Sequence, residues 1–353
     1  MNVDDFDFDL PDELIAQEPP AVRGGSRRLV VNRDTGTTEF TTFTRLADYL
    51  RAGDLLVVND TKVFPARLLG QRVPSGGMVE CLLLSPSGVG AGESEEWDAL
   101  MHPGQKLKPG ARVVFERDGA CLHGEVIARH FHGRRTVRLW TDGRIDVATA
   151  IERIGHIPLP PYIKRDDRPE DRDRYQTVYA RERGSIAAPT AGLHFTVGQL
   201  EALAALGIER VQITLHVGYG TFKPVRAERV EDHQVDPEPF TVSADAAAAL
   251  TRARREGRRV IAVGTTTARA LESLAIAADG RVEASSGDTR LFIHPGHTFT
   301  LVDGLITNFH LPRSSLLMLV AALAGRDPVL DAYREAVARG CRFYSYGDAM
   351  LVI

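Results

Sequence analysis

The sequence predicts a discontinuous, three-layer α/β domain that is interrupted by a small inserted antiparallel β-barrel. Strands and helices alternate from Thr196 onward, and residues 28–60 have the same α/β texture. Between these segments, residues 66–145 hold short β-rich runs separated by glycine, proline and serine, and no helical period interrupts them. We therefore assign residues 1–65 and 151–353 to the α/β domain and residues 66–150 to the barrel.

The first α/β segment contains two predicted strands, Leu29–Asn32 and Leu55–Asn59, with a helical pattern at residues 46–50 between them. The second strand runs into the polar sequence Asn-Asp-Thr-Lys. This run is a polar cluster at the carboxyl end of a predicted strand.

The barrel segment has strand composition in five places, spaced as in successive hairpins. These runs are ARLLGQRV, MVECLLL, ARVVFE, GEVIARHF and RTVRLW. We expect them to form a compact antiparallel barrel that contributes no helix to the main sheet.

The second α/β segment contains a charged run, KRDDRPEDRDR at residues 164–174. We expect a solvated loop there, with a mobile flap as the alternative because a glycine-rich motif follows. Thr196 and Gln199 then form the capping box of a helix that ends at Gly207, and Ser243 caps an alanine-rich helix that ends at Gly257. This alternation predicts a largely parallel sheet with helices on its faces. The predicted strands here are Glu209–Val217 and Arg259–Val263.

Composition excludes several classes of protein. Apolar residues make up 43% of the chain and charged residues 25%, as in globular proteins. The longest apolar stretch, Leu316–Ala324, is about half of the ~20 residues that span a bilayer. Three scattered cysteines indicate a reducing compartment, so we expect a cytoplasmic protein without membrane contact.

The charge balance argues against a nonspecific DNA-binding protein, because the formal net charge is −4. Two local arginine clusters, at residues 252–259 and 129–138, are either solvated faces or an RNA footprint. The second cluster surrounds Phe131, which His130 and His132 flank. Two histidines without a third ligand rarely hold zinc, so we assign no metal site.

Four polar clusters fall at predicted strand ends or helix starts. They are residues 188–196, 214–222, 263–269 and 307–312. The third opens a helix whose free N–H groups suit a carboxylate or phosphate. The sequences GxSxG, GxxxxGK[ST] and HExxH are absent, and no GxGxxG follows the first strand.

Several longer motifs carry a family resemblance. They are FDFDLPDELIAQ, GDLLVVNDTKVFPARL, IPLPPYIKR, DRYQTVYA, AAPTAGLHFT, ITLHVGYGTFKPV, VDGLITNFHLPRSSLLMLVAALAG and FYSYGDAMLVI. Together they resemble the S-adenosylmethionine:tRNA ribosyltransferase-isomerases from about residue 4 to the C-terminus. This resemblance implies a monomeric queuosine-pathway enzyme whose α/β domain is interrupted by a β-barrel. S-adenosylmethionine would be its ribosyl-donor substrate, with no true cofactor.

The implied reaction moves the ribosyl group of S-adenosylmethionine onto 7-aminomethyl-7-deazaguanine at the tRNA wobble position and isomerises it. Its products would be epoxyqueuosine-tRNA, adenine and methionine. A base must remove a proton beside the sulfonium, and adenine must be protonated as it leaves. Histidine is the natural two-way proton carrier.

The matched motifs supply candidate residues for these steps. For catalysis we choose His194 first, because it lies between Gly192 and a capped helix. The full catalytic set is His194, His216, His310, Asp60 and Asp348. The expected substrate-binding set is Thr190, Gly192, Gly218, Thr221, Thr265, Thr266, Arg269 and Asn308.

One segment departs from the family pattern, which has a histidine and a serine ahead of a glutamate after TFKPV. Here Asp236 and Pro237 occupy those positions, although His233 and Glu238 match. A role assigned to the missing histidine does not transfer to this chain, and the proline stiffens the loop.

Two alternatives remain open from the residues themselves. A noncatalytic RNA-binding protein would use the barrel as its platform and bind tRNA without consuming S-adenosylmethionine. A metal-dependent hydrolase would use the histidines and lose activity with a chelator.

Overall fold

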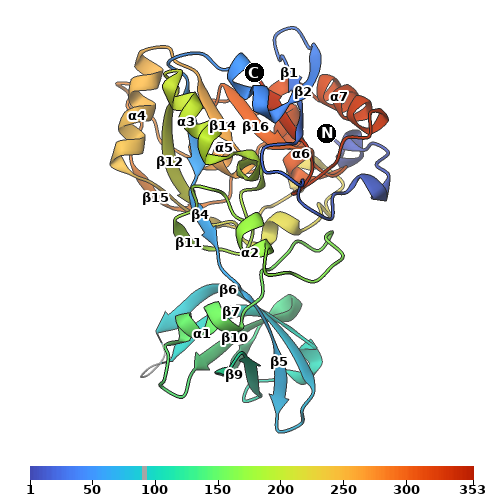
Figure 1. Ribbon diagram of the computed structural model, residues 1–353, viewed down its shortest axis with the longest axis vertical. Helices are drawn as coiled ribbons and strands as arrows, with labels where there is room; N and C mark the ends of the chain where they lie inside the picture. Colours follow the sequence, from blue (N-terminus) through green and yellow to red (C-terminus); the bar gives the residue numbers. More distant parts are fainter. Residues whose placement is uncertain (90–93) are drawn as a thin grey trace.

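Two parts of different architecture make up the structure, an α/β body on a nine-stranded sheet and a closed β-barrel (Figure 1). This computed structural model describes residues 1–89 and 94–353, apart from the side chains of Val89 and Phe222. The barrel extends from one end of the body, and both chain termini lie in the body (Figure 1). The predicted fold class is confirmed.

The large sheet takes strands from both ends of the chain. Its members are β1 (Arg27–Val31), β2 (Thr38–Thr42), β3 (Leu55–Asn59), β12 (Glu209–Leu215), β13 (Glu238–Val242), β14 (Val260–Val263), β15 (Ser285–Thr289), β16 (Gly304–Asn308) and β17 (Ala349–Val352). They lie in the order β15-β13-β12-β3-β14-β16-β17-β1-β2. The four strands predicted for the α/β segments correspond to β1, β3, β12 and β14.

The sheet is mixed, which corrects the expectation of a largely parallel one. The four adjacent strands β12, β3, β14 and β16 are parallel, and so are β17 and β1. The other neighbouring pairs are antiparallel. A short turn joins β1 to β2, and such a connection forces antiparallel pairing, whereas parallel strands need a longer crossover.

Alternate residues of the central strands face two separate cores. Leu55 and Val57 of β3 belong to one hydrophobic cluster, and Leu56 and Val58 to the other. The first cluster includes α4 (Ala244–Arg255), α5 (Thr265–Glu272), α6 (Ser315–Ala324) and α7 (Arg326–Ala338); the second includes α3 (Val197–Ala205) and the 3₁₀ helix η3 (Phe43–Tyr49). The sheet is therefore the middle of three layers, which explains its almost wholly apolar central strands.

The barrel closes in the order β10-β7-β6-β5-β8-β9. Its strands are β5 (Arg67–Val73), β6 (Met78–Val89), β7 (Glu95–His102), β8 (Arg112–Arg117), β9 (Ala120–Arg129) and β10 (Arg134–Trp140). The sequence reasoning missed β7, whose inward residues Trp97, Ala99 and Met101 alternate with polar or partly exposed ones. Helix α1 (Val147–Ile154) packs on β9 and β8 and buries four side chains in the barrel core. The chosen domain boundaries stay a prediction.

The charged run at residues 164–174 is only partly a solvated loop. It ends in the short helix α2 (Asp171–Arg174). The side chains of Arg165 and Asp171 are 14% and 4% exposed and form an ion pair with an N–O distance of 2.7 Å. The expectation of full solvation is wrong for these two residues, because each supplies the other's counter-charge.

The connection between barrel and body is made of closely packed backbone. Strand β4 (Thr61–Val63) leads out of the body and pairs with β11 (Glu182–Ser185). The chain returns at His156, whose backbone exchanges hydrogen bonds of 2.8 and 3.2 Å with Arg67. A Cβ atom on the preceding Gly155 would lie 1.9 Å from the carbonyl oxygen of Pro65. Only glycine fits at this crossing.

We predict that Gly155→Ala destabilises the protein by about 1–3 kcal/mol, because a methyl group there forces the two connecting segments apart. Gly155 has φ −69°, so strain from the dihedral angle does not contribute. Urea unfolding measures the loss. The matched control is Gly198→Ala in α3, where nothing lies within 4 Å of the added Cβ and stability stays the same or rises. Equal stabilities for the two variants would contradict the close crossing.

Candidate functional site

A pocket opens at the carboxyl ends of the parallel strands, where the fold class places ligands. The space between its walls is about 560 Å³, including the part open to solvent. It brings together six of the residues chosen from the sequence, namely Thr190, Thr221, Thr265, Thr266, Asn308 and His310. Further walls come from residues that were not chosen, Tyr162, Tyr175, Tyr344 and Ser345 among them.

One wall of the pocket is the start of helix α5. Gly264 precedes it with φ +94°, a conformation that favours glycine, and no side chain of the described residues caps the helix. The first backbone N–H groups of a helix have no partner within the helix. The buried Oγ1 of Thr266 has no hydrogen-bond partner among the described residues. This end of α5 therefore offers several unused donors to an anionic group.

Asn308, the last residue of β16, contributes a second polar part of the pocket wall. Its Nδ2 donates to the carbonyl oxygen of Tyr344 at 3.0 Å and to Nε2 of His194 at 3.1 Å. Both amide hydrogens are therefore used. Its buried Oδ1 has no partner within residues 1–89 and 94–353. An unused acceptor at a pocket wall suits a hydrogen-bond donor or a cation.

His194 lies behind this wall, not in it. Because Asn308 Nδ2 can only donate, His194 Nε2 accepts, and Nδ1 carries the proton toward Ser26 Oγ at 2.9 Å. Burial lowers the pKa of His194 to about 4, against the opposing effect of Asp348. Both ring nitrogens thus have protein partners, an arrangement that suits a positioning residue better than a proton carrier. The choice of His194 as first catalyst stays a prediction.

His310 is the histidine that lines the pocket. Its Nε2 forms a 2.8 Å hydrogen bond with Thr307 Oγ1, and its backbone N–H donates to the hydroxyl of Tyr333. Burial lowers the pKa of His310 to about 3. The ring is therefore neutral at pH 7, able to accept a proton but holding it weakly.

A buried ion pair supports the turn that carries Thr221. The guanidinium of Arg269 contacts the carboxylate of Glu238. The same carboxylate accepts hydrogen bonds from the Gly218 N–H at 3.0 Å and from Thr221 Oγ1 at 3.3 Å. Arg269 and Gly218 thus act behind the pocket wall, through Glu238. Sequence reasoning did not select Glu238.

The departure from the family pattern falls beside this turn. Asp236 pairs with Lys223 at 2.6 Å. A Cβ on Gly220 would lie 2.8 Å from that aspartate's side chain. The residue that replaces the family histidine therefore holds the 218–223 segment from outside the pocket.

Asp60 and His216 follow the neighbouring strands β3 and β12 and lie in a second polar region. Asp60 accepts from Thr214 Oγ1 at 2.7 Å and pairs with Arg181 at 2.9 Å, and burial raises its pKa. His216 Nδ1 shares a 2.8 Å hydrogen bond with Thr61 Oγ1, and burial lowers its pKa. Neither side chain lines the pocket.

Asp348 and Gly192 also lie outside the pocket lining. Asp348 pairs with Arg27 at 2.9 Å and accepts the backbone N–H groups of Arg27 and Arg342. A Cβ on Gly192 would lie 2.1 Å from the hydroxyl of Tyr179, so the space beside this glycine is filled by protein.

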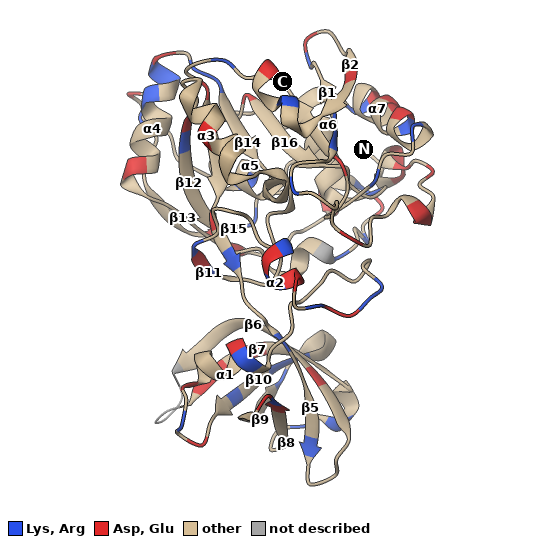
Figure 2. Ribbon diagram, in the orientation of Figure 1, with Lys and Arg blue, Asp and Glu red and all other residues tan. Residues whose placement is uncertain are grey.

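The two arginine clusters are partly neutralised. Arg252 and Arg258 pair with Glu209, and Arg259 pairs with Asp54. The end of α4 that carries this cluster lies far from the barrel (Figure 2). In the barrel cluster, Arg138 pairs with Glu96, and Arg135 is buried and bonded to backbone carbonyls. Phe131 is 86% exposed.

Two features are absent from the described residues. No helix in residues 1–89 and 94–353 is long and apolar enough to cross a membrane. Within the same residues, no three side chains of histidine, cysteine, aspartate or glutamate converge as metal ligands would.

Known proteins resemble this chain over its whole length. A family model described as queuosine biosynthesis protein matches residues 3–352. Two curated relatives, each an S-adenosylmethionine:tRNA ribosyltransferase-isomerase, come from Desulfitobacterium hafniense (50% identical) and Heliobacterium modesticaldum (51%), with full coverage of both chains in each comparison. A crystal structure of S-adenosylmethionine tRNA ribosyltransferase from Thermotoga maritima is 38% identical, with a TM-score of 0.55 over 99% of this chain and all of that one.

We predict that the buried histidines make folding stability depend on pH. The unfolded chain protonates histidine below about pH 6.5, whereas the folded state keeps His194 and His310 neutral down to about pH 4 and 3. The unfolded state therefore binds more protons in this window, and stability falls as the pH is lowered.

The loss amounts to up to about 1.4 kcal/mol per pH unit for each histidine. Urea unfolding between pH 7 and 5 measures it for the parent and for His310→Gln, which removes one of the two contributions. The same pH dependence in both proteins would contradict a buried, neutral His310.

Proposed function

The chain belongs to the queuosine biosynthesis protein family, and from that membership we propose the reaction and the roles of the pocket residues. Full-length relatives at about 50% identity are S-adenosylmethionine:tRNA ribosyltransferase-isomerases, so the chain is an enzyme of this type. The catalytic interpretation is favoured over a noncatalytic RNA-binding protein.

The proposed reaction transfers the ribosyl group of S-adenosylmethionine to 7-aminomethyl-7-deazaguanine at the wobble position of tRNA and isomerises it. Epoxyqueuosine-tRNA, adenine and methionine are the products. S-adenosylmethionine is thus consumed as a substrate. We propose further that the enzyme works as a monomer in the cytoplasm.

One observation carries the assignment of the donor site: two buried, unused polar atoms of opposite character face one pocket. The end of α5, with Thr266 Oγ1, offers donors, and Asn308 Oδ1 offers an acceptor. The methionine part of the donor is a zwitterion that needs both. We place its carboxylate at the start of α5 and its ammonium group at Asn308 Oδ1.

We assign proton transfer to His310. Its neutral imidazole accepts a proton from the ribose C5′ atom, whose hydrogens the adjacent sulfonium makes acidic. Because burial disfavours the imidazolium, the ring gives the proton up readily, and the departing adenine needs one. His194 acts through Asn308 as a positioning residue. The remaining candidates, His216, Asp60 and Asp348, support the strand ends from outside the pocket.

We predict that Thr266→Val weakens S-adenosylmethionine binding about tenfold or more, because a hydrogen bond to a charged group contributes about 1.5–3 kcal/mol. Isothermal titration calorimetry measures the dissociation constant. Thr44→Val is the matched control, since Thr44 is exposed and its hydroxyl shares a hydrogen bond with that of Thr42. Equal binding by the two variants would place the carboxylate elsewhere.

We predict that the parent releases adenine from S-adenosylmethionine in a single turnover with tRNA that bears the 7-aminomethyl-7-deazaguanine base. His310→Gln slows this step by about 10²- to 10⁴-fold, as expected for a lost acid–base group. His216→Gln, outside the pocket, stays much closer to the parent. A rate for His310→Gln within about threefold of the parent would remove His310 from the chemistry, and no adenine from the parent would refute the proposed function.

A further inference from the structure

A second hollow lies directly behind the polar wall of the pocket. Pro19, Pro20, Arg23, Arg174, His194 and Ser345 are among the residues that line it. Ser345 lines both hollows. His194 lines the second hollow and Asn308 lines the pocket, and the 3.1 Å contact between these two side chains connects them. A ligand that occupies both cavities would pass beside this one side-chain pair.

Arg23 and Arg174 line this second hollow, Arg342 contacts its lining residue Tyr346, and none of the three has a carboxylate partner in the described part of the chain. Arg23 donates to the carbonyl oxygens of Gln176, Leu193 and Asp173 at 2.9, 3.4 and 2.7 Å. Arg174 donates to the carbonyl of Pro20, and Arg342 to those of Glu18 and Tyr346. Within the described residues, none of the three has a carboxylate oxygen at ion-pair distance.

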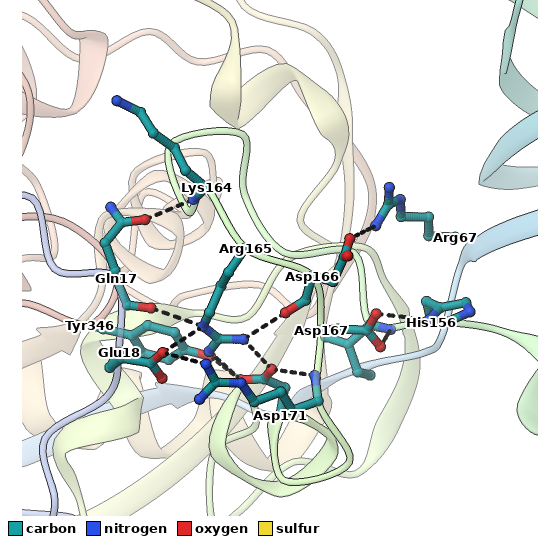
Figure 3. Close-up of polar contacts among 12 residues, drawn as sticks. Gln17, Glu18, Arg67, His156, Lys164, Arg165, Asp166, Asp167, Asp171 and Tyr346 are labelled. Carbon is teal, nitrogen blue, oxygen red and sulfur yellow. Dashed lines mark hydrogen bonds and ion pairs between the residues drawn. The ribbon is translucent and has the colours of Figure 1, made fainter.

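Two nearby carboxylates, those of Asp171 and Glu18, already pair with other cations, whereas that of Asp173 acts on Arg23 from beyond ion-pair distance. Figure 3 shows that Arg165 contacts both Asp171 and Glu18, and that Asp171 also accepts from the hydroxyl of Tyr346. Glu18 pairs with Arg168 as well, at 3.1 Å. The arginines of the hollow therefore remain a local excess of positive charge, although the chain as a whole is acidic.

The charges of this hollow repel one another. Burial, and next the charge of Arg174, lower the pKa of Arg23, while the carboxylate of Asp173 opposes them. The positive charges of Arg342 and Arg23 also contribute to the lowered pKa of His194. Each guanidinium has five N–H donors, and Arg174 uses one of them on the described part of the protein. An anion with several acceptor oxygens would satisfy these donors and relieve the repulsion.

We propose that Arg23, Arg174 and Arg342 form a subsite for an RNA phosphodiester that flanks the nucleotide entering the pocket. This inference rests on the proposed function, which supplies two substrates. S-adenosylmethionine has one anionic group, and the start of α5 takes it. The tRNA carries a phosphate at every nucleotide, and guanidinium groups match phosphate oxygens in a bidentate way.

The test compares Arg174→Gln with Arg174→Lys, because Arg174 has the fewest protein contacts of the three. A labelled, unmodified tRNA transcript is the probe, and its dissociation constant is measured over a series of salt concentrations. We expect Arg174→Gln to weaken binding about tenfold and to flatten the log K against log salt slope by about 0.7–0.9. Arg174→Lys keeps the charge and therefore the slope.

Arg255→Gln is the matched control. Arg255 is exposed at the distant end of α4 and belongs to the cluster that lies far from the barrel. Its loss leaves the slope at the parent value. Binding of S-adenosylmethionine stays the same in all these variants. Should Arg174→Gln fail to fold, Arg342→Gln gives the same comparison.

Two results would overturn the subsite: parent slopes for both Arg174→Gln and Arg342→Gln, or a loss of S-adenosylmethionine binding with tRNA binding intact. Adenine release separates this failure from that of the proposed function. Adenine from the parent with unchanged slopes refutes the subsite alone. A flattened slope in Arg174→Gln, together with no adenine from the parent, refutes the proposed reaction and leaves the phosphate subsite standing.

Discussion

The buried amide of Asn308 holds three parts of the site together. It ends strand β16, and its Nδ2 donates both to the Tyr344 carbonyl and to the His194 ring. These bonds fix the direction of Oδ1 toward the pocket and set the tautomer of His194. Without this amide, the C-terminal wall around Tyr344 and the loop around His194 would lose their common anchor. A carboxylate in its place could make neither donation.

Burial and charge divide the chemistry among the histidines. His194 and His310 are both neutral at pH 7 because desolvation opposes their charged forms. They differ in access, since His310 reaches the pocket while Asn308 and Ser26 occupy both nitrogens of His194. The guanidinium groups close to His194, those of Arg23 and Arg342, lie on the side of the second hollow. The site thus separates an uncharged reaction pocket from a cationic region that suits the polyanionic substrate.

Much of the fold could be predicted from the sequence, because local sequence patterns agree with the secondary structure that forms. The structure confirms three such local predictions: the apolar strand β3, the capping box at Thr196 and the N-cap at Ser243. Strand β7 was not predicted because its first residues are mostly acidic. The apolar residues that face inward, Trp97, Ala99 and Met101, alternate with polar or partly exposed ones and form no continuous apolar run. The site was harder to predict, because the His194–Asn308 contact spans 114 residues of sequence. Glu238 did leave a signal: it occupies an inward position of β13, in line with Phe240 and Val242, where a lone carboxylate needs a buried partner.

We propose that one polar pocket binds the methionine zwitterion between the start of α5 and Asn308. A crystal structure of the enzyme with bound S-adenosylmethionine tests it most directly. We expect carboxylate oxygens about 3 Å from Thr266 Oγ1 and an ammonium nitrogen about 3 Å from Asn308 Oδ1. A methionine group located beside Asp60 and His216, or among Arg23, Arg174 and Arg342, would contradict it.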